Sequence, residues 1–166
     1  MIKLAREIMR LAKLAAANGY IALRPDKAAA EIINKFMSEL GISNLITPSD
    51  MHMTLIYDKR DDILAEYVSS DKSYTANITD IKALGEPGSE YYAIAIVFEA
   101  PEIALRHKNL IAKGFEHGYD DFVPHMSVKY KPSEDDIAKA KASLAKLKAK
   151  ISSANFGNEF SESIKG

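Results

Sequence analysis

The chain contains nearly the same six residues twice, HMTLIY at 52–57 and HMSVKY at 125–130. Each copy reads as a histidine, a methionine, a small hydroxyl residue, an aliphatic residue, a variable residue and a tyrosine. On a strand, residues i and i+2 share one face. His52 is therefore expected to share a face with Thr54, and His125 with Ser127, while the methionine and the aliphatic residue point into the core. The repeat predicts two similar strands that each expose an imidazole and a hydroxyl.

A single histidine on a strand is more often a packed or surface side chain than a catalytic one. The same residue types on the same face of two strands are hard to attribute to packing. An imidazole titrates near about pH 6.5, so one histidine can act as general base while the other acts as general acid. The two hydroxyls can donate to phosphate oxygens. We therefore expect His52, Thr54, His125 and Ser127 to form a catalytic set for phosphodiester chemistry that needs no metal and no cofactor.

The order of the predicted elements indicates an α+β domain, because helices and strands do not alternate regularly. Helix and strand patterns, with Gly and Pro as boundary signals, give the element positions. Helices are expected at 2–17, 25–40, 101–113 and 134–150, and strands at 20–24, 52–57, 74–84, 90–100 and 122–130. Residues 151–164 are expected to form a last strand or a pair of short strands. We expect two-lobed, pseudo-symmetric antiparallel sheets with flanking helices, forming a central cleft. Residues 1–18 would be an amphipathic helical extension and residues 19–166 the domain.

Charge and composition limit the classes of partner. The 166-residue chain has a net charge of −1 and no cysteine. A protein that holds a long nucleic acid usually carries a basic excess, so we expect none as partner, whereas a small anionic ligand is compatible with this balance. No apolar run approaches the roughly 20 residues that span a bilayer. We expect a cytoplasmic protein without a membrane partner, and the helix at 2–17 could pack on its own domain or dock to another protein.

Other side chains are weaker candidates. Tyr20 could stack on a purine, or it could be a packing residue. Lys129, two residues beyond Ser127, could contact a phosphate, with a solvated lysine as the alternative. Glu159 and Asn158 could bind a base edge or be surface residues. Tyr57 and Tyr130 are expected on the opposite face from the histidines, as packing residues, and His107 on a solvated helix face. His117, Asp120, Asp121 and His125 match no familiar metal spacing.

The two motifs resemble the mark of the two-histidine (2H) phosphoesterase superfamily, His-x-Thr/Ser followed by an apolar residue, twice. The copies here are His52-Met53-Thr54-Leu55 and His125-Met126-Ser127-Val128, and the resemblance covers roughly residues 19–160. Within that superfamily the chain looks most like the phage anti-CBASS nucleases. GYIALR is similar to their first strand, DDFVPHMSVKY to the block through their second motif, and NEF to a C-terminal stretch with an acidic residue. The first helix has no counterpart.

The resemblance implies an activity: degradation of the cyclic di- and trinucleotides that bacteria use as antiviral signals. It implies that Tyr20 stacks on a base and that Glu159 contacts one. One histidine would take a proton from a ribose 2′-hydroxyl, which attacks the neighbouring 3′-phosphate, while the other protonates the leaving 5′-oxygen. If the chain is phage-encoded, it would act in the host cytoplasm. The alternatives are an enzyme acting on RNA ends with 2′,3′-cyclic phosphates or 2′-5′ links, a binding module for a cyclic nucleotide, and a virion-associated protein.

Overall fold

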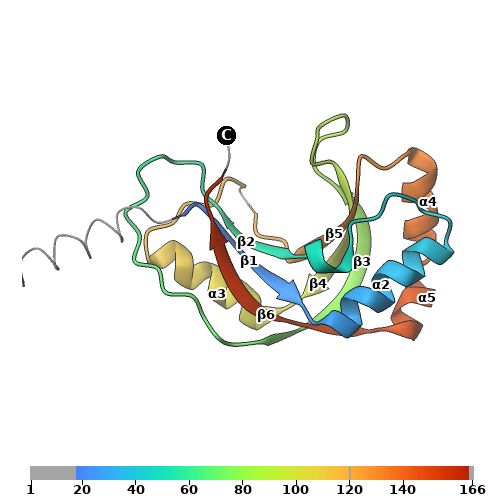
Figure 1. Ribbon diagram of the computed structural model, residues 1–166, viewed down its shortest axis with the longest axis horizontal. Coiled ribbons are helices and arrows are strands. Elements are labelled where there is room, and N and C mark those ends of the chain that lie inside the picture. Colours follow the sequence, from blue (N-terminus) through green and yellow to red (C-terminus); the bar gives the residue numbers. More distant parts are fainter. Residues whose placement is uncertain (1–17, 120, 165–166) are drawn as a thin grey trace, which may run out of the picture.

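A computed structural model describes residues 18–119 and 121–164 of the chain. The described part is an α+β fold with one antiparallel sheet, as Figure 1 shows. Its elements are β1 (Tyr20–Pro25), α2 (Lys27–Glu39), the 3-10 turn η1 (Pro48–Asp50), β2 (Met53–Tyr57), β3 (Tyr74–Leu84), β4 (Ala93–Glu99), α3 (Pro101–Ala112), β5 (His125–Tyr130), α4 (Glu134–Ala142), α5 (Leu144–Lys150) and β6 (Ser153–Glu162). The helix predicted at 2–17 lies outside the described residues, and the division at residue 18 stays a prediction.

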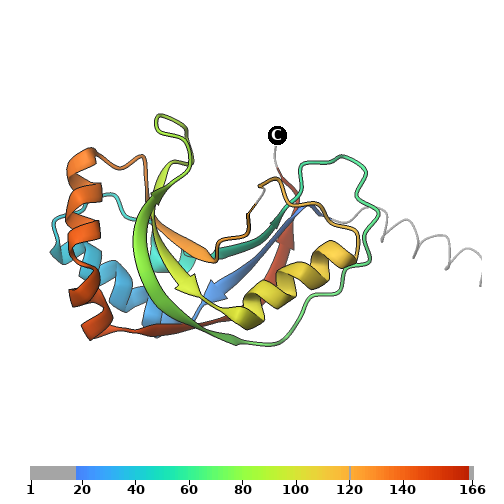
Figure 2. The same ribbon diagram turned by 180° about the vertical axis from the view of Figure 1, so that it is seen from behind.

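The strand order places the two motif strands at the two edges of the sheet. It runs β2-β1-β6-β3-β4-β5, and every neighbouring pair is antiparallel. The sheet curls so strongly that the edge strands β2 and β5 come into contact with each other (Figures 1 and 2). Separate sheets were expected from the sequence, but β3 and β6 join the two halves through a short pairing of 74–77 with 153–156. The pseudo-symmetry and the central cleft stay predictions.

Helices pack on the apolar face of this sheet. α3 contacts β2 and β3, α4 and α5 contact β3, and α2 contacts α5 (Figure 2). The strands bury alternate apolar side chains in one core, including Ile78, Ile81, Ile94, Ile96 and Phe156. Burying one such side chain stabilises a fold by about 1.5–3 kcal/mol. None of the described helices has the length and hydropathy to cross a membrane.

Among the described residues, the predicted helix starts are confirmed to within two residues, and one helix interior is corrected. Asp26 caps α2 by accepting from the Ala29 N–H at 2.8 Å. Ser133 and Asp136 form the capping box expected before α4. The single helix predicted at 134–150 is two helices, because the chain turns at Ser143. The buried hydroxyl of Ser143 donates to the Ala140 carbonyl at 2.7 Å, an arrangement that competes with helical bonding.

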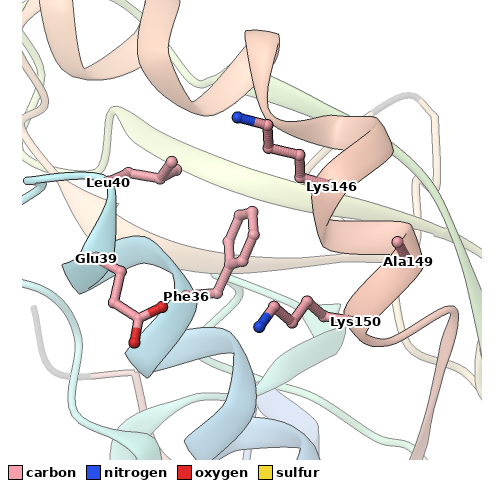
Figure 3. Close-up of a pocket in the computed structure, with 6 residues that line it drawn as sticks. All are labelled: Phe36, Glu39, Leu40, Lys146, Ala149 and Lys150. Carbon is pink, nitrogen blue, oxygen red and sulfur yellow. The ribbon is translucent and has the colours of Figure 1, made fainter.

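A hollow of about 430 Å³ separates α2 from α5. Figure 3 shows the ring of Phe36 between the two helices, with Lys146 and Lys150 extending from α5 on either side of the ring. All the residues that line it lie in or at the end of α2 and in α5, and none belongs to a motif strand. It is therefore a feature of helix packing that is separate from the histidines.

Two carboxylates fasten the long segment between β2 and β3. Asp58 accepts from Arg60 Nε at 3.0 Å and from the Glu116 N–H at 2.8 Å. Burial alone raises the pKa of Asp58, but the bonds from Arg60 and Glu116 outweigh it and leave the pKa below its usual value. Asp58 therefore ties the end of β2 to the loop that follows α3.

The second carboxylate, Glu159 on β6, is fully buried and ion-paired. Its two oxygens accept from Arg106 Nε and a terminal guanidinium nitrogen, both at 2.8 Å. The Tyr67 hydroxyl donates to it at 2.8 Å and the Ser70 N–H at 3.0 Å. Burial raises the pKa of Glu159, but Arg106 and the other donors outweigh it and lower the pKa overall. Glu159 thus holds α3 and the segment before β3 onto β6.

Removing Arg106 should be costly, because it would leave the Glu159 carboxylate buried without its cation. We expect Arg106→Ala to lower the free energy of unfolding by about 3–5 kcal/mol, as for other broken buried pairs. Urea unfolding followed by circular dichroism measures this. The control is Lys139→Ala, which removes an exposed pair with Asp135 and should cost at most about 0.5 kcal/mol. Equal losses in the two variants would contradict the assignment.

Candidate functional site

The two motif histidines are held in the same way. His52 Nδ1 lies 2.8 Å from the Asp50 carbonyl oxygen, and His125 Nδ1 lies 2.6 Å from the Val123 carbonyl oxygen. A carbonyl can only accept, so each Nδ1 must carry the hydrogen. In the neutral ring the lone pair is then on Nε2. Each histidine can therefore take up a proton, or give one when charged, through Nε2.

Each motif strand contains a β-bulge at the fourth residue of the hexamer. On β2, Thr54 pairs with Ala22 and Ile56 with Ile21, so Leu55 is an extra residue. On β5, Ser127 pairs with Ala95 and Lys129 with Ile94, so Val128 is the extra residue. A one-residue bulge moves every later side chain to the other face of the sheet. Both copies of the hexamer therefore form the same bulged strand.

The bulges overturn three sequence predictions. Tyr57 and Tyr130 were expected opposite the histidines, but the shifted register places them on the histidine face. Lys129 was expected on the face of Ser127 and instead points inward. Its side chain is buried, with Nζ donating to the Ser43 carbonyl and lying 3.7 Å from Asp136. Lys129 therefore anchors the strand and does not lie beside the histidines.

Groups from outside the sheet bind the carbonyl of each bulge residue. His107 Nδ1 donates to Leu55 O at 2.7 Å, and the Ile46 N–H donates to Val128 O at 2.9 Å. His107 was expected on a solvated helix face, but it is partly buried and stacks on Phe122 at 4.1 Å between ring centroids. Burial lowers the pKa of His107, against the bond to Leu55, which raises it. His107 is thus a fixed support of the first motif.

A tyrosine lies next to each motif hydroxyl. The Tyr20 hydroxyl is 3.0 Å from Thr54 Oγ1, and burial raises the pKa of Tyr20 to about 12. The Tyr20 ring meets the His52 ring edge-on, with centroids 6.0 Å apart. Burial and Tyr91 raise the pKa of Tyr130, while the nearby hydroxyl of Ser127 lowers it. Tyr20, predicted as a substrate contact, therefore lies with the catalytic candidates.

The two histidines are near enough to influence each other. Burial lowers the pKa of His125, the bond to Val123 raises it, and the charge of His52 lowers it further. The contact between the strands β2 and β5 agrees with this. The four catalytic candidates therefore converge on one face, whereas Glu159 lies buried in its ion pair with every carboxylate oxygen occupied. Its predicted contact with a base does not fit that position.

Among residues 18–119 and 121–164, no group of three or more His, Asp or Glu side chains could hold a metal ion. A second surface hollow, of about 700 Å³, lies between α3 and the loop that follows it and includes His107, His117 and Tyr119. Neither His52 nor His125 lines it. The site is thus a set of imidazole and hydroxyl groups on a sheet face.

This face belongs to a region matched by a known family. Residues 17–165 match the family model described as Anti-CBASS protein Acb1. The chain belongs to this family. An Anti-CBASS protein Acb1 from Vibrio phage KVP40 is 23% identical over 130 residues, covering 78% of this chain and 81% of the phage protein. One from Escherichia phage RB16 is 23% identical over 124 residues, covering 74% and 68%. For a 25% identical relative from Sphingomonas paeninsulae, the match covers 70% of this chain and 19% of that protein.

In this Acb1 family member, sequence reasoning missed His117, which connects the two motifs. Its Nδ1 accepts from the Tyr57 N–H at 3.1 Å, and the next residue, Gly118, donates its N–H to the Tyr57 carbonyl at 2.8 Å. His117 lies in the loop that leads to His125. Burial, followed by the charges of His107 and His125, lowers its pKa to about 4. Neutral His117 thus ties the end of β2 to the segment that carries the second motif.

Arg24 is a second missed residue. Its guanidinium donates to the Ser49 carbonyl at 3.0 Å and stacks over Phe160 at 4.3 Å from the ring centroid. Ser49 precedes Asp50, whose carbonyl fixes the His52 ring. Arg24 therefore holds the turn that orients His52. The sequence does not indicate that Arg24 lies near the turn before His52, because its contact with Ser49 depends on the pairing of β1 with β2.

His117 predicts a pH dependence of stability. The folded pKa of about 4 lies below the usual value of about 6.5, so the unfolded chain binds this proton first as pH falls. Stability should therefore decrease between about pH 6.5 and pH 4. His117→Asn keeps an acceptor near the position of Nδ1 but cannot titrate. The free energy of unfolding of this variant should therefore decrease less between about pH 6.5 and pH 4. Urea unfolding at several pH values compares the two, and identical slopes would contradict the role of His117.

Proposed function

We propose that the chain is a metal-independent phosphodiesterase that opens cyclic di- and trinucleotide antiviral signals and so counteracts CBASS in the host cytoplasm. The observation that carries the proposal is the matched pair of imidazoles. Each has its Nδ1 bound to a carbonyl, its Nε2 left for proton transfer and a hydroxyl two residues on. The family match and the phage relatives named Anti-CBASS protein Acb1 support the same conclusion.

The reaction uses the two histidines in opposite protonation states. The base accepts the proton of a ribose 2′-hydroxyl at Nε2, and the 2′-oxygen forms a bond to the adjacent 3′-phosphorus. The bond from phosphorus to the 5′-oxygen breaks, and the acid donates its Nε2 proton to that oxygen. The ring opens to a linear product with a 2′,3′-cyclic phosphate, which water can then hydrolyse. Thr54 and Ser127 donate to the phosphate oxygens as their charge grows.

We assign the base to His125. Burial and the neighbouring His52 lower its pKa, so its ring is neutral over more of the physiological pH range than an ordinary histidine. His52 then provides the proton for the leaving oxygen. The Tyr20 hydroxyl lies 3.0 Å from Thr54 Oγ1, and if Tyr20 donates in this contact the Thr54 hydrogen is available for a phosphate oxygen.

The test is a cleavage assay on purified protein. Cyclic 3′,3′ di- and trinucleotides are incubated with the full chain in excess EDTA, and the products are separated by chromatography. An RNA oligomer ending in a 2′,3′-cyclic phosphate is included. We expect ring opening that EDTA does not change, with His52→Ala and His125→Ala each lowering kcat by about 10²–10⁴-fold. Lys139→Ala, on the exposed face of α4, serves as the control.

Each other result has a defined meaning. Intact rings with a processed RNA end would move the chain to RNA-end chemistry. A bound ring that is not cut would make the chain a binding module and the proposed mechanism wrong. Cleavage that EDTA abolishes would contradict the metal-independent reaction.

The assignment of His125 predicts a pH profile. The base must be neutral to act, and its folded pKa is lowered, so the acid limb of kcat/KM should lie below about pH 6.5. Activity should fall only as pH drops through that lowered pKa. Initial rates at limiting substrate between pH 4.5 and pH 8 measure this limb. An acid limb at or above about pH 6.5 would transfer the role of base away from His125.

A further inference from the structure

Each motif tyrosine packs against a second tyrosine that is open to solvent. Tyr57 lies 6.1 Å from Tyr119 between ring centroids, with the rings tilted by 34°. Tyr130 lies 6.2 Å from Tyr91, with the rings nearly perpendicular at 78°. The outer members are the more exposed ones, at 62% for Tyr119 and 68% for Tyr91, against 37% for Tyr130. Two similar aromatic pairs therefore accompany the two motifs.

Backbone contacts place each outer tyrosine at the end of a motif strand. The Gly118 N–H donates to the Tyr57 carbonyl, which brings Tyr119 to the last residue of β2. Ala93 pairs with Tyr130, which brings Tyr91 to the last residue of β5. The outer tyrosines come from two unrelated loops, one after α3 and one between β3 and β4.

The two pairs lie in opposite directions from the histidines. Five successive antiparallel pairings separate β2 from β5 in the sheet, so these neighbouring edge strands run in opposite senses. His52 immediately precedes β2 and His125 is the first residue of β5, and the two histidines influence each other, whereas Tyr57 and Tyr130 are the last residues of these strands. The bulges turn both tyrosines onto the histidine face. The tyrosine pairs therefore bracket the histidines.

This arrangement suits a phosphodiester with a base on each side. A phosphate held between two imidazoles has one nucleoside leading away through its 3′-oxygen and another through its 5′-oxygen. Nucleobases stack on aromatic side chains without strict sequence preference. Packing alone does not require the outer rings, since most of the surface of Tyr91 and Tyr119 faces water.

We propose that the pairs Tyr57–Tyr119 and Tyr130–Tyr91 are the stacking sites for the two bases that flank the cleaved phosphate. The proposal rests on the proposed phosphodiesterase function and specifies how its substrate is held. The site would then recognise the two nucleosides that flank the cleaved phosphate. Rings of two and of three nucleotides both contain such a pair, so both could bind in the same way.

Kinetics on the outer tyrosines test the proposal. Tyr119→Ala and Tyr91→Ala should each raise KM for a cyclic dinucleotide by about tenfold, because one stacked base is lost, and should leave kcat within about twofold. The double variant should raise KM by about a hundredfold. Tyr119→Phe and Tyr91→Phe keep the ring and should behave as the unaltered chain. Val68→Ala, which truncates another apolar side chain that is mainly exposed, is the control.

A binding measurement separates this inference from the proposed reaction. The chain has no tryptophan, so the fluorescence of a cyclic dinucleotide that contains 2-aminopurine can be followed directly. In His125→Ala, stacking should quench this fluorescence on binding, and the added Tyr→Ala changes should weaken both quenching and affinity. The same loss of binding in a chain that cuts no ring would support the stacking sites and reject only the reaction. Unchanged KM and quenching in both Tyr→Ala variants, with cleavage still dependent on the histidines, would overturn the stacking sites alone.

Discussion

The extra residue in each motif strand, Leu55 in β2 and Val128 in β5, determines what the site can contain. Without the bulge, period-two alternation would turn Tyr57 and Tyr130 away from the histidines and bring the residues before them, Ile56 and Lys129, onto the histidine face. With it, a histidine, a hydroxyl and a tyrosine from one six-residue motif share a surface, while both residues of the bulge remain buried. One local irregularity thus reconciles a buried strand with a polar face, and the chain uses it twice.

The two bulged strands would be of little use far apart, and contacts that are distant in sequence bring them together. The sheet curls until its edges touch, and His117 binds the end of β2 from the loop that continues into β5. The ion pair between Glu159 and Arg106 fixes α3, on which His107 stands, against β6. The placement of the two imidazoles therefore depends on groups that lie outside the two motifs.

Local signals were enough to predict much of the fold. Pro, Gly and capping residues bound the helices and turns, and the paired hexamers identify the four catalytic candidates. Leu55 and Val128 are ordinary aliphatic residues, so the sequence does not indicate that they form bulges. The faces of Tyr57, Tyr130 and Lys129 were predicted wrongly for this reason. Glu159 and Arg106 lie 53 residues apart and pair only because β6 and α3 pack together. Long-range pairing of this kind leaves no periodic trace in a sequence.

The groups that hold the bulges have a further consequence for how the sheet meets other molecules. β2 and β5 are its outermost strands, and exposed strand edges invite pairing with an extended segment of another chain. Here the outward carbonyl of Leu55 is bound by His107, that of Val128 by Ile46, and both backbone groups of Tyr57 by the loop after α3. These bonds, together with the backbone irregularity of each bulge, oppose strand addition and edge-to-edge aggregation. The features that arrange the histidines thus also protect the sheet from recruiting a seventh strand.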